Sequence, residues 1–243
     1  MSARVRGVLF DLDDTLFDHN HATVCTTGAL RESEPAFAVW PLEELRRRHS
    51  DVLEVIHREV ISGRMSIDDA RRERFRRLLA AAGAGEKALE RAPEMAARYR
   101  EEYQRYWRPV AGAVELLIAL KSRGFKVAIV TNNLTAEQEM KIRRCAFDAH
   151  VDALITSENA GASKPDVEIF TAALTAAGIA NSEAVMVGDA WDTDIAGALA
   201  ASIRPVWFNW RGQAQRDRRV AEITSLTPLE SVLDAVIGGP DQT

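Results

Sequence analysis

Short apolar runs recur along most of the chain, and longer amphipathic segments separate them. The runs predict buried strands at 8–10, 126–130, 153–156, 184–187 and 205–208. Helical patterns lie between them, at 112–123 with Gly124 after it, and at 165–177 with Gly178 after it. A proline in the first turn of the second pattern agrees with a helix start. Strands that alternate with helices predict an α/β fold with a doubly wound parallel sheet.

Residues 17–109 interrupt this alternation. The segment is rich in Arg, Glu, Leu and Ala and has few strand signals, so it predicts a bundle of about four helices. Gly63 and the segment 83–85 are the expected breaks between helices. We therefore expect a core domain made of 1–16 plus 110–243, with an inserted helical domain at 17–109. The tail after Asn209 is polar beyond the fifth strand, and we assign no element to it.

Polar side chains follow three of the five predicted strands. Asp11 and Asp13 end the first strand, Thr131 ends the second and Asp189 ends the fourth. In such sheets ligands bind outside the carboxyl ends of the strands, so these groups are expected to form one site. Carboxylates there suit magnesium, which prefers hard oxygen ligands. The alternative for a carboxylate after a strand is an N-cap of the next helix, which for Asp14 is as good an interpretation.

Two further residues fit a phosphate site. Lys164 offers a point positive charge, and Thr131 offers a hydroxyl and neighbouring backbone amides for phosphate oxygens. Asp194 follows Asp189 by five residues and is expected to hold Lys164 by an ion pair; Asp192 is the weaker candidate.

Four segments in this order, FDLDDTLFD, VTNN, SKPD and VGDAWDTDIAGA, resemble the four motifs of the haloacid dehalogenase (HAD) superfamily. The resemblance covers the predicted core, roughly 4–18 and 108–210. It implies a Rossmann-like HAD core, and the insert lies where helical caps of the C1 type occur in subfamily I. It places the chain in the phosphatase branch of the family. No motif within the insert matches residue by residue.

The resemblance also implies a mechanism. Asp11 attacks phosphorus and becomes an aspartyl phosphate, while Asp13 protonates the leaving oxygen and then activates water. Mg²⁺ is held by the Asp11 carboxylate, the Asp13 backbone carbonyl and the Asp189 carboxylate. The phosphoryl oxygens are bound by Thr131, Asn132 and Lys164, which offset charge in the transition state. Asp194 supports the site by orienting Lys164 or the surroundings of the metal.

The expected activity is hydrolysis of a small-molecule phosphate monoester, on a nucleoside monophosphate, phosphoglycolate or a sugar phosphate. A phosphomutase of the β-phosphoglucomutase type also keeps Asp13 and stays open as an alternative. A haloacid dehalogenase is disfavoured, because family dehalogenases lack the second Asp of the first motif. A non-catalytic binding protein is disfavoured too, because none of the motif positions is lost.

Composition narrows the class further. The chain has 243 residues with a net charge of −5, which gives no indication of a nucleic-acid or membrane partner. Two distant cysteines make neither a disulfide framework nor a zinc site, and no apolar run approaches ~20 residues. A cytoplasmic setting is the expectation. The basic run 71–77 is interpreted as a charged helix face, and Tyr99, Tyr103 and Tyr106 as core packing of the insert rather than a stacking site.

Overall fold

The structure is a computed structural model that describes residues 4–61 and 64–238. It divides into two compact units. The first, called the core unit here, comprises the described residues up to Asp18 and from Arg108 onward. The second, called the helical unit, is His19–Trp107.

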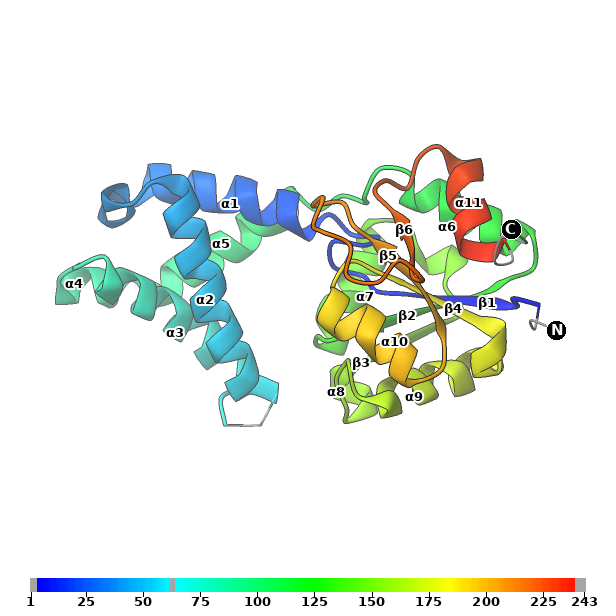
Figure 1. The fold of residues 1–243 in the computed structure, drawn as a ribbon. Coiled ribbons are helices and arrows are strands. Elements are labelled where there is room, and N and C mark those ends of the chain that lie inside the picture. Colours follow the sequence, from blue (N-terminus) through cyan, green and yellow to red (C-terminus); the bar gives the residue numbers. More distant parts are fainter. Residues whose placement is uncertain (1–3, 62–63, 239–243) are drawn as a thin grey trace. The chain divides into compact units, whose positions relative to one another are not determined.

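The core unit is built on one sheet of six parallel strands in the order β3-β2-β1-β4-β5-β6 (Figure 1). The strands are β1 (Gly7–Phe10), β2 (Lys126–Thr131), β3 (Ala153–Thr156), β4 (Ala184–Gly188), β5 (Arg204–Phe208) and β6 (Ala221–Ile223). The predicted α/β fold with a doubly wound parallel sheet is confirmed. β6 was not predicted, because its three residues are polar or partly exposed and lack an apolar run.

Helices cover both faces of this sheet (Figure 1). One face carries α6 (Ala113–Ser122) and α11 (Leu229–Ile237), and the other carries α9 (Val167–Ala177) and α10 (Ala196–Ala200). The predicted helices at 112–123 and 165–177 correspond to α6 and α9. The remaining elements of this unit are α7 (Thr135–Arg144), α8 (Ser157–Ala160), η2 (Asp148–His150), η3 (Asn181–Glu183) and η4 (Trp191–Ile195). None of these, nor α10 and α11, was predicted from the sequence.

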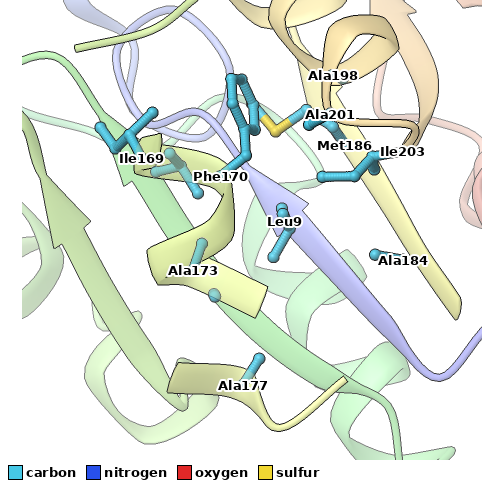
Figure 2. Close-up of a cluster of buried hydrophobic side chains, with 12 residues drawn as sticks. Leu9, Ile169, Phe170, Ala173, Ala177, Ala184, Met186, Ala198, Ala201 and Ile203 are labelled. Carbon is cyan, nitrogen blue, oxygen red and sulfur yellow. The ribbon is translucent and has the colours of Figure 1, made fainter. Parts of the chain in front are cut away.

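The central strands β1 and β4 are apolar because both faces of the sheet are buried there. Every residue of β1 and β4 is buried, and side chains alternate between the faces along each strand. Figure 2 shows Leu9 and Met186 from these strands packed with Phe170 of α9 and Ala198 of α10. Burying a side chain such as Leu or Met contributes roughly 1.5–3 kcal/mol. The ends of β1 and β4, where the acidic residues begin, are therefore fixed by a packed core.

The two connections between the core unit and the helical unit are paired with each other. The Asp18 amide donates to the Arg108 carbonyl at 3.1 Å, and the Val110 amide donates to the Leu16 carbonyl at 2.8 Å. The Arg108 guanidinium also lies 2.7 Å from the Asp18 carboxylate. The chain thus leaves the core and returns to it at adjacent positions.

Four long helices make up most of the helical unit: α1 (His19–Ser33), α2 (Leu42–Ile61), α3 (Ile67–Ala81) and α5 (Ala92–Arg105). The short elements are η1 (Pro35–Val39) and α4 (Glu86–Leu89). The Ser66 hydroxyl accepts from the Asp69 amide at 3.1 Å and so caps α3. The glycine segment 83–85 separates α3 from α4, whereas Gly63 lies outside the described residues.

Tyr99 belongs to the apolar core of the helical unit. It is 6% exposed, and its ring lies 5.2 Å from Phe75 and 4.9 Å from His49, centroid to centroid. Tyr103 packs against the same cluster and its hydroxyl lies 2.6 Å from His19 Nδ1. These contacts agree with core packing for Tyr99 and Tyr103.

The basic run 71–77 carries ion pairs along α3, and each links residues three or four positions apart. The pairs are Arg71–Asp68, Arg72–Asp69, Arg76–Glu73 and Arg77–Glu73. The run is therefore a charged helix face, as interpreted from the sequence. Within 4–61 and 64–238, none of the helices combines the length and the apolar character that crossing a bilayer requires.

Candidate active site

A buried carboxylate–lysine pair lies beside β1, where the order of the strands in the sheet reverses. β1 is flanked by β2 and β4, the topological switch point at which open α/β sheets bind ligands. Asp11 comes directly after β1, and its amide donates to the Val187 carbonyl at 2.9 Å. Lys164 Nζ lies 2.6 Å from Asp11 Oδ1, and the two side chains are 3% and 10% exposed. This distance gives a charge-assisted hydrogen bond in a water-poor site.

Two groups hold Lys164 in place. Its Nζ lies 2.7 Å from Asp194 Oδ1, so the lysine bridges two carboxylates. Its backbone is bound by the side-chain amide of Asn132, which accepts from the Lys164 amide at 2.7 Å and donates to the Lys164 carbonyl at 2.8 Å. The side chain of Asn132 is thus used to position Lys164.

Burial raises the pKa of the Asp11 and Asp189 carboxyl groups in this site, and neighbouring carboxylates raise it further. Burial raises the pKa of Asp11 well above its usual range, and the negative charges of Asp194 and Asp189 add to this, although Lys164 opposes them. Burial, reinforced by Asp194, raises the pKa of Asp189 to about 6. Burial acts to lower the pKa of Lys164, but the charges of Asp11 and Asp194 raise it above its usual value. Burial is thus the main reason that Asp11 and Asp189 resist ionisation, and the charge of Asp194 adds to it.

Asp194 is brought to the end of β4 by a tight turn. η4 is a single turn of π-helix, and the Asp194 carboxylate accepts from the Ala190 amide at 3.0 Å. Gly188, the last residue of β4, allows this approach because a Cβ there would lie 2.4 Å from Asp194 Oδ2. Gly188 is therefore needed because a side chain would not fit there, and not because of its backbone conformation.

The donor set fits a divalent cation of the magnesium type. Asp11, Asp189 and Asp194 each offer a carboxylate oxygen, and these oxygens all lie within 4.8 Å of one another. Hard oxygen donors are the ligands that Mg²⁺ prefers. The side chain of Asp13 is engaged elsewhere, so a contribution from Asp13 would come from its backbone carbonyl.

Arg211 provides a cation that the sequence did not indicate. Its guanidinium binds Asp189 Oδ2 through Nη1 and lies 2.8 Å from Asp14 Oδ2 through Nη2. It also stacks on the Trp210 ring, 4.1 Å from the centroid. Asp14 is thus an ion-pair partner of Arg211. No motif covers this arginine, because it lies in the tail to which no element was assigned.

Asp13 and Thr131 are linked by residues of α7. The Asp13 carboxylate lies 2.5 Å from Lys141 Nζ and accepts from Gln138 Nε2 at 2.9 Å. Gln138 Nε2 also donates to Thr131 Oγ1 at 3.1 Å. Asn133 Nδ2 also donates to the Asp13 carboxylate, at 3.3 Å. Gln138 and Lys141 were not found from the sequence.

Asp192 and Trp191 of the fourth motif lie outside this cluster. Asp192 is exposed and pairs with Arg216 at 2.5 Å, so it is not part of the buried network. Trp191 packs edge-on against Trp207 with ring centroids 5.0 Å apart. Trp191 therefore contacts β5, and Arg216, which follows β5, contacts Asp192 and lies 5.8 Å from the centroid of the Trp191 ring.

The motifs, the fold and the site converge on one family. A family model for haloacid dehalogenase-like hydrolases matches residues 5–202, and the chain belongs to this family. The inserted helical unit lies within the matched region. The family resemblance and the Rossmann-like HAD fold expected from the sequence are both confirmed.

Among characterised relatives, the chain is similar to two glyceraldehyde 3-phosphate phosphatases. It is 30% identical to that of Methanothermobacter thermautotrophicus, over 94% of this chain and 96% of the relative. It is also 30% identical to that of Pyrococcus furiosus, over 95% and 94%. A phosphoserine phosphatase of Thermus thermophilus is 35% identical over 66% of each chain. Family and relatives confirm the predicted enzyme class, a hydrolase that acts on phosphate monoesters.

Solved structures share the fold over nearly the whole chain. The HAD-hydrolase YfnB of Bacillus subtilis, solved with magnesium bound, is 24% identical and has a TM-score of 0.71, covering 96% of this chain and 100% of that one. A 2-haloacid dehalogenase of Pseudomonas syringae is 30% identical with a TM-score of 0.63, covering 94% and 98%. A HAD-hydrolase and a 2-haloacid dehalogenase thus share this fold, and the reaction must be argued from the site.

Proposed function

We propose that the protein is a magnesium-dependent phosphatase that hydrolyses a small-molecule phosphate monoester through an aspartyl phosphate on Asp11. The observation that carries the proposal is the placement of Asp11. It lies 2.6 Å from Lys164 and within a cluster of carboxylates at the switch point of the sheet. A buried nucleophile, a fixed cation and a divalent-cation site are the components that phosphoryl transfer requires.

In the first step Asp11 attacks phosphorus. A bond forms between its carboxylate oxygen and phosphorus, and the bond between phosphorus and the leaving oxygen breaks. Asp13 gives its proton to that oxygen, so the leaving group departs as a neutral alcohol. Lys164, Thr131 and the backbone amide of Asn132 bind the phosphoryl oxygens and stabilise their charge.

In the second step water releases the phosphoryl group. Asp13, now a carboxylate, takes a proton from a water molecule as its oxygen attacks the phosphorus of the aspartyl phosphate. The bond to Asp11 breaks, inorganic phosphate leaves, and both aspartates return to their starting states. Asp13 lies two residues after the nucleophile Asp11, and we assign it both the acid role in the first step and the base role in the second.

The metal would be held by the carboxylates of Asp11 and Asp189 and by the backbone carbonyl of Asp13. When bound, Mg²⁺ neutralises negative charge on the phosphoryl oxygens and on the attacking carboxylate. Burial and, after it, the negative charge of Asp194 raise the pKa values of Asp11 and Asp189, and this supports the assignment because a bound divalent cation would stabilise both carboxylates. Asp194 acts on Lys164 at 2.7 Å and so supports the site from beside it.

We assign the helical unit the role of a cap that controls access of the substrate, with the core domain as 1–16 plus 110–243 and the cap as 17–109. It is inserted directly after the first motif, through paired connections at Asp18 and Arg108. Two relatives that match over most of this chain are named as glyceraldehyde 3-phosphate phosphatases, so glyceraldehyde 3-phosphate is the first candidate substrate. Phosphoserine, phosphoglycolate, sugar phosphates and nucleoside monophosphates complete the panel.

The proposal is tested by measuring phosphate release from this panel, with Mg²⁺ and with excess chelator. Release that depends on the metal and favours one compound class supports the reaction and identifies the substrate. The absence of release from every compound, with the protein folded and with magnesium binding shown by calorimetry, overturns the phosphatase assignment. Release that is equal with chelator overturns the metal requirement alone.

Asp11→Asn tests the nucleophile. The amide keeps the size of the side chain and its contact with Lys164, while Asp194 still pairs with that lysine, so the fold should be preserved. Turnover should fall by at least ~10³-fold, because a nucleophile and the groups that act with it are lost together. The measurement is the turnover number of the best substrate, with circular dichroism as the check on folding. Activity within tenfold of the unmodified protein would reject Asp11 as the nucleophile.

A further inference from the structure

The Asp13 carboxylate is bound on both oxygens by residues that the family motifs do not include. Lys141 Nζ lies 2.5 Å from Oδ1, and Gln138 Nε2 donates to Oδ2 at 2.9 Å. Asn133 Nδ2 also donates to Oδ2, at 3.3 Å. With both oxygens bound, the rotamer of Asp13 is set from outside its own loop.

Both donors come from one face of α7. Gln138 and Lys141 are three residues apart, so they project from the same side of the helix. Gln138 is 0% exposed and Lys141 is 2% exposed, although both are polar. The Lys141 ammonium also lies 4.9 Å from the centroid of the Phe17 ring, which closes its other side. α7 therefore directs a cation and an amide inward at a single carboxylate.

This arrangement is unusual for a stabilising contact. Removing a lysine from water is costly, and a buried ion pair is often no more stabilising than apolar residues of similar volume. The Asp13 side chain is 24% exposed, so a buried lysine is not needed to neutralise it. The placement of Lys141 is better explained by what it does to Asp13 than by what it adds to the core.

Gln138 connects Asp13 to a second residue of the site. Its Nε2 donates both to Asp13 Oδ2 and to Thr131 Oγ1, at 2.9 Å and 3.1 Å. The acid–base residue and the phosphate-binding hydroxyl are thus fixed to each other through one buried amide. A shift of α7 would move both groups together.

We infer that Lys141 and Gln138 are positioning residues that hold the Asp13 carboxylate in the orientation its acid–base role requires. The inference rests on the proposed function, because it assigns these residues to the proton transfers of that reaction. Lys141 and Gln138 act through Asp13 and are not catalytic residues themselves. Without these two residues Asp13 can still transfer a proton, but its carboxylate is no longer held in one orientation.

The test uses Lys141→Met, which removes the ammonium and keeps much of the chain length. It compares kcat/KM for an alkyl phosphate and for p-nitrophenyl phosphate, since kcat/KM covers the step in which the leaving group departs. The alkyl ester needs a proton from Asp13, whereas p-nitrophenolate hardly does. We expect the alkyl ester to lose about 10²-fold and the aryl ester under threefold, within the 10²–10⁴-fold range of general acid catalysis.

A double-mutant cycle with Asp13→Asn isolates the route of the effect. If Lys141 acts only through Asp13, Lys141→Met should cost nothing further in the Asp13→Asn background. Lys121→Met is the matched control, because Lys121 also forms a lysine–aspartate pair, at 2.7 Å from Asp152, but on another part of the core unit. It should alter thermal stability without changing the ratio of the two esters. Gln138→Leu should lower the alkyl ester in the same sense as Lys141→Met.

Four outcomes overturn the inference. Equal losses on both esters would mean that Lys141 acts on the fold or on the phosphoryl group instead. A loss in the Asp13→Asn background as large as in the unmodified protein would mean that it acts independently of Asp13. No turnover of either ester by the unmodified protein would reject the proposed function and, with it, the inference. If the unmodified protein turns over both esters and Lys141→Met leaves the ratio of the two kcat/KM values unchanged, the inference alone is rejected.

Discussion

Gly188→Ala adds one methyl group at the point where the network is tightest. The new Cβ would lie 2.4 Å from Asp194 Oδ2 and 2.5 Å from Asp194 Cβ and Cγ. Ordinary contact begins at 3.4 Å, so Asp194 must move by about 1 Å. Gly188 does not have a positive φ, so the alanine is opposed by this contact and not by its backbone.

The displacement reaches the nucleophile through Lys164, which bridges Asp194 and Asp11 at 2.7 Å and 2.6 Å. A misplacement of 1 Å near the reacting atoms can cost about 10²-fold in rate. Overpacking a core position costs typically 1–3 kcal/mol of stability. We therefore expect kcat/KM to fall about 10²-fold, with a lower midpoint of thermal unfolding. The assay is phosphate release with Mg²⁺, at a temperature well below that midpoint.

Gly7→Ala is the matched control. Gly7 begins β1, and its Cβ would lie 2.5 Å from Ile179 Cδ1, the flexible end of an apolar side chain. The change is the same glycine-to-alanine substitution in the neighbouring strand, but at the end away from Asp11. It should lower stability and leave kcat/KM within threefold. If Gly188→Ala also stays within threefold while the protein is folded, the coupling of Asp194 through Lys164 to Asp11 is refuted.

Two further predictions concern charge. Arg211→Gln removes a cation that competes with the metal for Asp189, so magnesium should bind about tenfold more tightly in calorimetry without substrate. Arg216→Gln, which removes the partner of exposed Asp192, should leave the magnesium affinity unchanged. Weaker magnesium binding by Arg211→Gln would show that Arg211 aids the metal. Burial, with Arg74 nearby, lowers the pKa of His49 well below 6.5, so its contribution to stability is present above pH 6.5 and is lost as pH falls. The loss should reach up to about 1.4 kcal/mol per pH unit in urea unfolding, and His49→Phe should abolish it; an unchanged slope in that variant would assign the pH dependence to other groups.

The sheet was predictable because parallel strands buried on both faces read as continuous apolar runs. The strands at 8–10 and 184–187 differ from β1 and β4 by one residue at one end. β6 and α7 were missed for different reasons. β6 has three residues, two of them exposed, and no apolar run. α7 buries Gln138 and Lys141, and the tertiary contacts that make this possible are not contained in a local pattern.

The candidate site followed from topology and from the motifs. Asp11 and Asp189 end neighbouring strands, so their approach could be predicted without coordinates. The orientation of Asp13 could not, since it depends on Lys141, which is 2% exposed. A lysine in a polar helix is ordinarily taken as solvent-exposed, and only its contacts with Asp13 and Phe17 in the structure reverse that interpretation.

The paired connections at Asp18 and Arg108 bear on how such a protein can change during evolution. Because the chain departs and returns at hydrogen-bonded neighbours, the core needs only a tight turn at this point, whatever lies beyond it. The entropy of closing a loop rises slowly with its length, so an insert can be lengthened or exchanged at little thermodynamic cost. The phosphate chemistry and the recognition of the substrate can therefore diversify separately, so that one reaction is retained while the range of substrates changes.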